Sequence, residues 1–404
     1  RVIDKAAREL GVDPIALRRQ NFITEFPYAT PVAVEYDTGD YTATMDKLEE
    51  IADLSGFEAR RKASEAKGML RGLGVNCYIE ACGIAPSNLV GQLGARAGLY
   101  DAATVRVNAT GSISVMVGAH SHGQGHETAF PQVVAEMLGI DESMIDIVHG
   151  DSSKIPFGMG TYGSRSIAVC GSAMVRATEK IINKAKKIAS HLLEASEADI
   201  ELKDGQFTVA GTDKSVAWGD VTLAAYVPHN YPLEDIEPGL EETAFYDPSN
   251  FTYPSGAYAC EVELDPETGK VTIERFSAAD DFGNVINPMI VTGQVHGGIG
   301  QGIGQALLEN CAYDENGQLL SASYMDYAMP RASDVPFFSV DHSCQTPCTH
   351  NPLGVKGCGE AGAIGSPPSV VNAVVDALQS GGHNVTHIDM PVSPSRVWAA
   401  MNNA

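Results

Sequence analysis

A glycine-rich stretch from Asn351 to Leu378 contains a residue suited to general-base chemistry. Between Gly354 and Gly365 the only acidic residue is Glu360. Glycine accepts backbone angles closed to other residues and lets a ligand come close to the main chain. A carboxylate that is desolvated and unpaired there holds a proton more tightly, which suits a general base. The alternative is that Glu360 only caps or forms an ion pair in a glycine-rich turn.

A buried helix is predicted directly after this loop. Ser366 is a good N-cap, and Pro367 suits the first helical position. Apolar residues then recur at helical spacing and form one stripe: Val371, Val374, Val375 and Leu378. The sequence therefore places one carboxylate on a tight loop that leads into the core.

Polar residues precede a second predicted helix. The segment HGQGHET covers residues 122–128, and the apolar face that follows, together with Pro131, sets a helix start close by. Gln124, Gly125 and His126 are thus expected at or just before an N-terminus. Free backbone N–H groups and the helix dipole favour an anion or a polar ligand there.

Two further segments are rich in glycine. Residues 157–166 read FGMGTYGSRS, which combines glycines with hydroxyl groups. In the segment 287–304, Gly293, Gly297, Gly300 and Gly304 share one helical face, so something is expected to pack closely against it. Together these loops indicate a large, phosphate-bearing organic cofactor that is held by main chain and amides, with Glu360 as the base.

Other site chemistries have weaker support. His120, His122 and His126 could hold a transition metal, but no further histidine or acidic motif accompanies them. Ser164 has no GxSxG elbow and no evident base, and no GxxxxGK[ST] phosphate loop occurs.

Composition limits the class of protein. The net charge of −24 argues against nucleic acid or an anionic membrane as partner. No apolar run approaches the ~20 residues that span a bilayer. The eight cysteines include no CxxC pair, which favours reduced, mostly buried thiols in the cytoplasm. The chain begins at Arg1 within a helical pattern, which indicates one part of a longer or divided polypeptide.

The hydrophobic periodicity and the positions of Gly and Pro predict an α+β fold of two mixed α/β lobes. The chain is long enough for two or three domains. Residues 1–67 form a helical and extended N-terminal segment, with one helix near Met45–Lys67. A first α+β lobe covers 68–225, and it includes a strand at Leu73–Glu80. A connecting arm without periodicity covers 226–256, and a second α+β lobe with the Glu360 loop covers 257–404.

The quoted motifs resemble the molybdenum hydroxylase (xanthine oxidase) family. HGQGHET, FGMGTYGSRS, NPMIVTGQVHGGIGQGIG and GVKGCGEAGAIGSPPSVVNAVVDAL occur in family order, and DPSNFTYPSGAY, MDYAMP and MPVSPSRVWAAM extend the likeness over nearly the whole chain. The similarity is greatest to the C-terminal half of the large, molybdopterin-binding subunit of aerobic carbon monoxide dehydrogenases.

The resemblance implies roles for individual residues. Glu360 would be the base beside molybdenum, Gln294 would hydrogen-bond the pterin, and the remaining positions would contact the cofactor or line the approach to the metal. These remaining positions are Gln124, Gly125, His126, Thr161, Tyr162, Gly163, Ser164, Arg165, Ser166, Lys356, Gly357, Cys358 and Gly359. No protein ligand to the metal is expected, because the pterin holds the molybdenum.

The resemblance also implies a cofactor, partners and a reaction. The cofactor would be molybdenum–molybdopterin cytosine dinucleotide, with copper only through an upstream loop outside the chain. Partners would be the N-terminal half of the subunit, an iron–sulfur subunit and an FAD subunit, in the cytoplasm or at the inner face of the membrane. The reaction would oxidise carbon monoxide with water to carbon dioxide. Alternatives are an aldehyde or N-heteroaromatic substrate, or an inactive isolated fragment.

Overall fold

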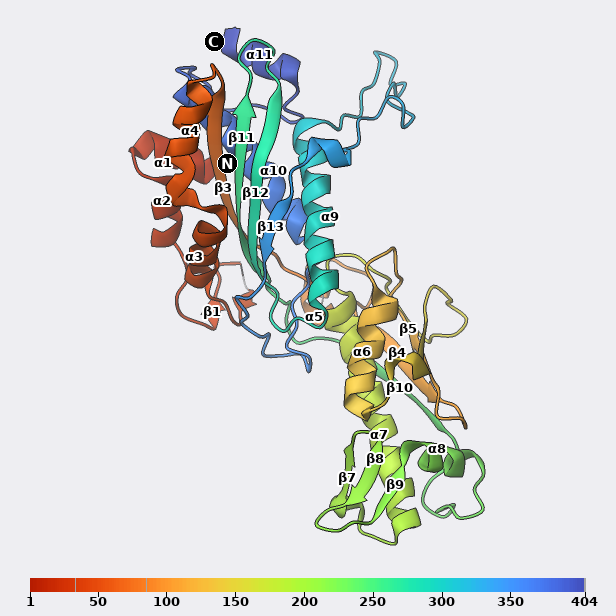
Figure 1. Cartoon of the computed structure of the whole chain (residues 1–404). Coiled ribbons are helices and arrows are strands. Elements are labelled where there is room, and N and C mark those ends of the chain that lie inside the picture. The colour runs from red at the N-terminus through yellow and green to blue at the C-terminus, as the bar shows by residue number, and fades with distance from the viewer. Residues whose placement is uncertain (33, 85, 403–404) are drawn as a thin grey trace.

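The computed structural model describes residues 1–32, 34–84 and 86–402. The molecule is elongated and has two lobes, each built around a four-stranded sheet (Figure 1). We call them the β3 lobe, with strand order β13-β12-β11-β3, and the β4 lobe, with strand order β10-β4-β5-β6. None of the helices in the described part of the chain is long and apolar enough to cross a membrane.

The sheet of the β3 lobe combines strands from distant parts of the chain. Neighbouring strands are antiparallel, except that β12 and β13 are parallel. The strands are β3 (Leu70–Ile79), β11 (Ser255–Leu264), β12 (Val271–Asp281) and β13 (Phe338–Asp341). Residues alternate between the two faces, so Tyr258 and Cys260 belong to one core and Ala257 and Ala259 to another.

Helices cover both faces of this sheet (Figure 1). On one face lies α10 (Ala361–Ser380), with α9 (Pro288–Leu307) packed beside it. On the other lie α3 (Tyr41–Ala52) and α4 (Phe57–Glu65). A Cβ at Gly72 or Gly74 of β3 would overlap the α10 backbone, so this close approach requires glycine.

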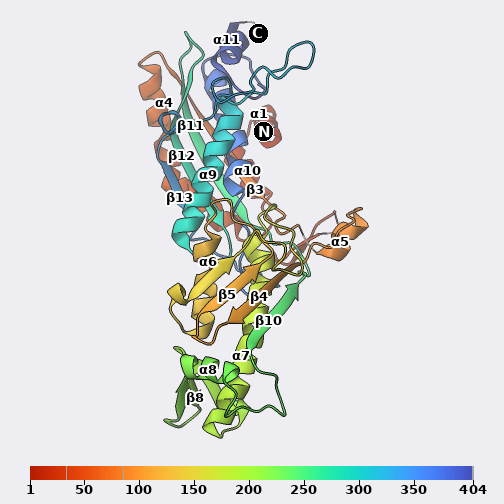
Figure 2. The ribbon, with the colours of Figure 1, turned by 90° about the vertical axis from the view of Figure 1, so that its right-hand side faces the viewer.

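The β4 lobe places two helices against its sheet and buries a separate hydrophobic core. Its strands are β4 (Asp101–Val107), β5 (Ile113–Val117), β6 (Ile145–Val148) and β10 (Leu240–Tyr246). The helices are α6 (His126–Leu138) and α7 (Ser172–Leu193), and a π-helical turn at Ser166–Gly171 leads into α7. The 90° view shows α9 running down to the end of α6, where the two lobes meet (Figure 2).

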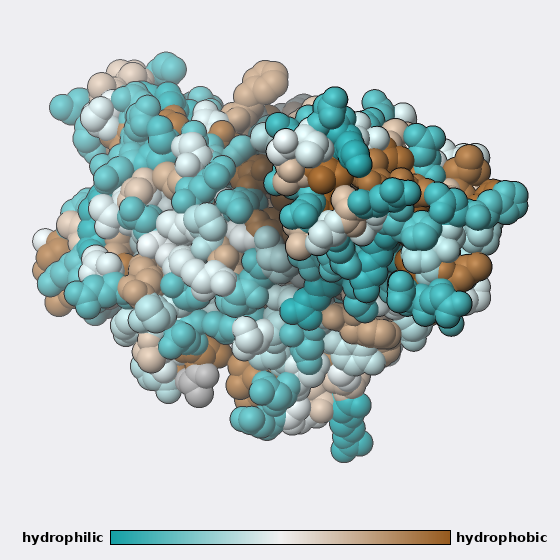
Figure 3. Space-filling view, turned by 90° about the horizontal axis from the view of Figure 1, so that it is seen from below, coloured by the Kyte–Doolittle hydropathy of each residue, from teal (hydrophilic) through white to brown (hydrophobic). Residues whose placement is uncertain are grey.

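Smaller elements complete the fold. A three-stranded sheet with α8 lies at the far end of the β4 lobe, and hydrophilic residues cover most of the surface seen from that end (Figure 3). Its strands are β7 (Ile200–Lys203), β8 (Gln206–Val209) and β9 (Ser215–Ala217), and α8 spans Trp218–Tyr226. The other α-helices and strands of the described residues are α1 (Val2–Leu10), α2 (Pro14–Gln20), β1 (Tyr28–Ala29), β2 (Glu35–Tyr36), α5 (Ser87–Gln92) and α11 (Pro394–Asn402).

The mixed α+β architecture is confirmed, but the structure differs from the expected division of the chain. Strand β3 falls within residues 68–225, yet it pairs with β11 of the other lobe. Strand β10 falls within the expected connecting arm at 226–256, yet it pairs with β4. The helix expected near Met45–Lys67 is interrupted at Asp53, whose φ of 48° ends α3.

Helix α10 begins earlier than expected. Glu360 is its N-cap residue, and the backbone N–H of Ile364 already donates to the Glu360 carbonyl. Ser366 lies inside the helix, where its hydroxyl donates to the Gly362 carbonyl, and Pro367 follows it there. Packing against α9 accounts for the added turn, because Gly362 lies directly on the α9 backbone.

The expectation about the glycine face of α9 holds at only one of its four glycines. A Cβ at Gly304 would overlap the Glu309 side chain and lie 2.7 Å from Pro330. A Cβ built at Gly293, Gly297 or Gly300 would meet no neighbouring atom within 4 Å. The close approach to the neighbouring helix comes from Gly298 and Gly302 on another face, which meet the first turns of α10. The spacing of the glycines shows that they share a helical face, but it does not show which glycines contact a neighbouring helix.

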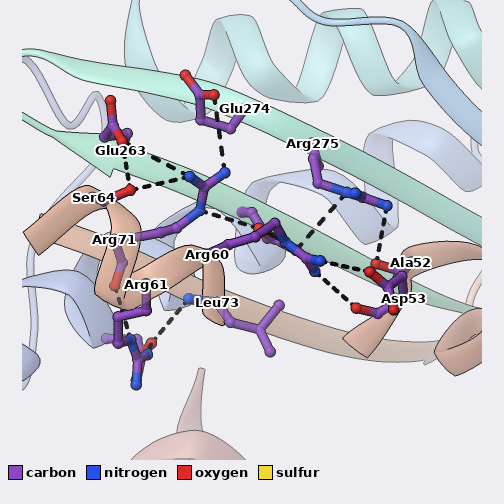
Figure 4. Close-up of polar contacts among 12 residues, drawn as sticks. Ala52, Asp53, Arg60, Arg61, Ser64, Arg71, Leu73, Glu263, Glu274 and Arg275 are labelled. Carbon is purple, nitrogen blue, oxygen red and sulfur yellow. Dashed lines mark hydrogen bonds and ion pairs between the residues drawn. The ribbon is translucent and has the colours of Figure 1, made fainter. Parts of the chain in front are cut away.

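A largely buried charge network joins α4 to the sheet of the β3 lobe (Figure 4). The carboxylate of Glu261 on β11 accepts two hydrogen bonds from Arg60, at 2.6 and 3.0 Å, and one from Arg71 at 3.2 Å. The Glu261 side chain is only 3% exposed, and that of Arg71 is 10% exposed. Solvent therefore screens these charges only weakly, and the Arg60 and Arg71 guanidinium groups are stabilised by the charge of Glu261.

We expect Glu261→Gln to destabilise the chain by about 3 kcal/mol, because it removes the buried counter-charge that Arg60 and Arg71 share. Arg71 then keeps only the more distant carboxylates of Glu263 and Glu274. The matched control is Glu241→Gln, whose carboxylate pairs with Arg106 on the surface, where both side chains are about half exposed. That change should cost about 1 kcal/mol or less. Urea unfolding of the two variants measures the difference, and equal losses would contradict the burial argument.

Candidate functional site

A pocket lies where the two lobes meet, and segments from both lobes line it. The start of α6, the loop before α7, the start of α9 and the loop before α10 converge around a cavity of about 240 Å³. Thirteen of the residues expected at the site line it: Gln124, His126, Thr161, Tyr162, Gly163, Ser164, Arg165, Ser166, Gln294, Lys356, Cys358, Gly359 and Glu360.

The two remaining expected residues, Gly125 and Gly357, support the pocket from behind. Gly125 is the N-cap residue of α6 with a φ of 76°, and a Cβ there would lie 2.8 Å from the Ile290 side chain. A Cβ at Gly357 would overlap the carbonyl of Ser164. Both glycines thus let neighbouring segments come together, and the first confirms the predicted helix start after Gln124.

Ser164 connects the Glu360 loop to the loop before α7. Its Oγ lies 3.1 Å from Glu360 Oε2, and the backbone N–H of Glu360 donates to the same Oγ at 3.2 Å. Ser164 has a φ of 52°, a left-handed conformation that is uncommon for a residue other than glycine. The surrounding chain holds it there, since the Gly83 N–H donates to the Gly163 carbonyl at 2.9 Å.

Glu360 lies at the pocket, as expected, but it is exposed rather than desolvated. It is also hydrogen-bonded to Ser164 rather than unpaired. The sequence of the loop suggested a desolvated and unpaired carboxylate, which would suit a general base. Within this chain Glu360 is neither. Gln294 lies nearby, since a Cβ on Gly359 would be 4.0 Å from Gln294 Oε1.

The sequence reading did not select Glu80, which follows β3 and is the second carboxylate at Ser164. Its Oε1 lies 3.0 Å from Ser164 Oγ, and its Oε2 is buried with no hydrogen-bond partner. Burial, with the adjacent charge of Glu360, raises the pKa of Glu80 to about 7. The one signal in the sequence was an acidic residue at the end of an apolar strand, and this pattern is common.

His126 presents an unpartnered nitrogen near the cavity. It is 5% exposed, stacks on Phe130 with ring centres 4.7 Å apart, and its Nδ1 has no hydrogen-bond partner. Burial lowers the pKa of His126 to about 4, so the imidazole is neutral at pH 7. A neutral ring can donate or accept one hydrogen bond to a bound group.

The two cationic residues of the predicted site are committed to buried partners. The Arg165 guanidinium donates to the Leu99 carbonyl at 2.8 Å and lies 3.5 Å from Asp101. The Lys356 ammonium donates to Asp281 at 2.9 Å, and both side chains are almost fully buried. Both residues line the pocket, but their charges mainly connect its wall to the neighbouring segments.

The three histidines do not form one metal site. The Nδ1 atoms of His120 and His122 lie 3.2 Å apart, whereas His126 is buried against Phe130. Across the described residues, the one group of three metal-type donors that converges is Asp37, Cys348 and His350, in another part of the fold. Burial raises the pKa of the Cys348 thiol to about 11.

Comparison with known proteins identifies the family. Residues 47–336 match the model of the molybdopterin cofactor-binding domain, so the chain belongs to the molybdopterin-binding domains of the molybdenum hydroxylase family. The resemblance drawn from the glycine-rich motifs is thereby confirmed.

Relatives named for different substrates are similar to this chain to nearly the same degree. The chain is 40% identical over 407 residues to the carbon monoxide dehydrogenase large chain of Hydrogenophaga pseudoflava. The alignment covers 99% of this chain and 50% of that protein. Carbon monoxide dehydrogenase from Oligotropha carboxidovorans matches with a TM-score of 0.91 and 38% identity, over 99% of this chain and 50% of that one.

Quinoline 2-oxidoreductase from Pseudomonas putida 86 matches with a TM-score of 0.92 and 37% identity, over 99% of this chain and 51% of that one. The chain spans about half the length of the relatives it matches.

Proposed function

We propose that the chain forms the part of a molybdenum hydroxylase active site that carries the general base. The observation that carries this proposal is the convergence of Glu360, Gln124 and Gln294 on one pocket between two lobes. In this proposal the complete enzyme oxidises carbon monoxide with water to carbon dioxide. Two electrons then pass to iron–sulfur and FAD partners.

The residues around the pocket fit a polar organic cofactor. The buried, unpartnered Nδ1 of His126 can accept or donate a hydrogen bond, and α6 begins at this residue, so its helix dipole favours an anionic group there. The side-chain amides of Gln124 and Gln294 add donors and acceptors. We propose the cytosine dinucleotide form of the molybdenum–pterin, with copper only through a loop outside this chain.

The bound molybdenum centre would supply the oxygen-transfer and two-electron chemistry. This chain would supply proton handling and orientation. Glu360 would accept the proton at its Oε atoms, and Ser164 would fix the direction of that carboxylate. Cys358 and Gly359 would shape the approach without a side chain large enough to block it. A second half of the subunit that covers Glu360 would exclude water, which strengthens such electrostatic effects.

A heteroaromatic substrate is the second candidate. It is favoured by the match to quinoline 2-oxidoreductase, whose TM-score of 0.92 is as high as the 0.91 of carbon monoxide dehydrogenase from Oligotropha carboxidovorans. Separate measurements of the turnover of carbon monoxide and of quinoline by the complete complex distinguish the two candidates. An aldehyde is a third class of substrate for the same assay.

The test of the cofactor site uses His126→Phe in the complex with the complete subunit. Phenylalanine keeps the stacking on Phe130 but removes the ring nitrogens, so molybdenum per subunit should fall by about two- to tenfold, as expected for one lost hydrogen bond. The control is His191→Phe, which removes an exposed imidazole that bonds Asn230 outside the pocket. Full molybdenum content in His126→Phe would contradict the assignment, and no molybdenum in any variant would favour an inert module.

A further inference from the structure

Ser164 stands between two carboxyl groups, and its hydrogens and lone pairs can be counted. Its Oγ is 3.0 Å from Glu80 Oε1, 3.1 Å from Glu360 Oε2 and 3.2 Å from the Glu360 backbone nitrogen. A serine hydroxyl has one hydrogen to donate and two lone pairs. The N–H of Glu360 uses one lone pair, so the hydroxyl can donate to only one of the two carboxyl groups.

The second carboxyl group can hydrogen-bond to Ser164 only by donating a proton of its own. The three contacts are therefore satisfied together when the two carboxyl groups share one proton. Otherwise two carboxylates would face the same oxygen, and one of them would lack a donor. Electrostatic repulsion favours the same arrangement, because two neighbouring carboxyl groups seldom carry a negative charge at the same time.

The surroundings decide which carboxyl group carries the proton. Glu80 is the more enclosed of the two, and its Oε2 is buried without a partner, which penalises the charged form. Glu360 is exposed to solvent, which favours a charge. The order of donation is then from Glu80 to Ser164, and from Ser164 to Glu360.

We propose that Glu80 is a positioning residue that acts through Ser164: it holds the shared proton and keeps Glu360 as the proton-accepting carboxylate at the pocket. This inference rests on the proposed role of Glu360 as the base. The pKa of Glu80, which burial raises to about 7, supports it, because Glu80 then keeps its proton below that pH and loses it above. Ionised Glu80 could no longer donate to Ser164.

The other titratable groups around Glu80 stay neutral over this range. Burial raises the pKa of the Cys82 thiol and the Tyr78 phenol well above their usual values. Burial also raises the pKa of the Cys358 thiol to about 12. Glu360 is therefore the neighbour whose charge acts on Glu80.

The first experiment titrates glutamate carboxyl groups in this chain. Glutamate labelled with ¹³C at Cδ keeps the buried aspartates Asp101 and Asp280 out of the NMR spectrum. We expect one resonance with a midpoint near pH 7, its loss in Glu80→Gln, and a shift of its midpoint to lower pH in Glu360→Gln. The control is Ser64→Ala, which removes a serine-to-glutamate hydrogen bond to Glu263 outside the pocket and should leave the resonance unchanged.

The second experiment measures kcat against pH for the complete complex. The glutamine amide of Glu80→Gln can still donate to Ser164, so this variant should lose the ionisation near pH 7 from the kcat profile. Glu80→Leu cannot donate and should lower kcat by about tenfold with little change in KM, as expected for a lost hydrogen bond to a charged group.

The two experiments separate the proposals. A Glu80 resonance that titrates like an ordinary glutamate would overturn the shared proton, even if the complex is active. An unchanged pH profile in Glu80→Gln would overturn the positioning role. Turnover near wild type in Glu360→Gln would instead overturn the proposed base, whatever the NMR titration shows.

Discussion

Replacing Glu360 by glutamine is expected to lower the turnover of the complete complex by about 10²- to 10⁴-fold, the range that a positioned general base contributes. Glutamine keeps the size of the side chain and can still accept a hydrogen bond from Ser164, so the pocket should keep its shape. Molybdenum content should stay near wild type, since the change removes a proton acceptor rather than a cofactor contact. Steady-state kinetics and metal analysis of the same preparation measure both effects.

The matched control is Glu127→Gln. Glu127 is another exposed glutamate near the pocket, but its carboxylate lies 2.9 Å from His149 Nε2 and does not line the cavity. We expect this variant to keep turnover within about threefold of wild type, as for most surface changes. If Glu360→Gln turns over as fast as Glu127→Gln with molybdenum bound, Glu360 is not the base.

The second large effect is expected on stability, from Gly362→Ala in the first turn of α10. A Cβ at this position would overlap the backbone of Val295 and Ile299 in α9. Because backbone atoms cannot move aside as a side chain does, we expect a loss of about 2–3 kcal/mol in the free energy of unfolding. The same shift of α10 would move the neighbouring Glu360 away from Ser164.

An adjacent helix supplies the control. Gly297→Ala in α9 places a methyl group where no atom lies within 4 Å, so it should stabilise the chain by up to about 1 kcal/mol through helix propensity. Urea unfolding monitored by circular dichroism compares the two variants. Equal stabilities would show that α9 and α10 do not approach as closely as the structure has them.

The sequence identified the parts of the site that are local in the chain. Gly125 was expected beside a helix start because glycine, Pro131 and an apolar face occur together, and the structure has it as the N-cap of α6. The motif order also identified the family, which residues 47–336 confirm. Such features depend on neighbours a few residues away, so spacing is sufficient to predict them.

Features that depend on distant segments were missed or misread. Glu80 gains its significance from Ser164 and Glu360, which belong to two other segments of the chain. Pro367 predicted a helix start, but packing against α9 extends α10 back to Ala361. The glycine spacing in α9 selected three open positions and only one packed position, Gly304, because periodicity does not reveal where the neighbouring helix lies.

The pairing of β3 with β11 has a consequence for how the chain folds. The β4 lobe occupies the chain between these two neighbouring strands, so it is a folded insertion within the sheet of the other lobe. Its own contacts can form first, and once formed they bring the ends of a long loop together, which reduces the entropy still to be lost. The β3 lobe needs β11, β12 and β13 before its sheet is complete. During synthesis it should therefore be the last part of the chain to become resistant to a protease.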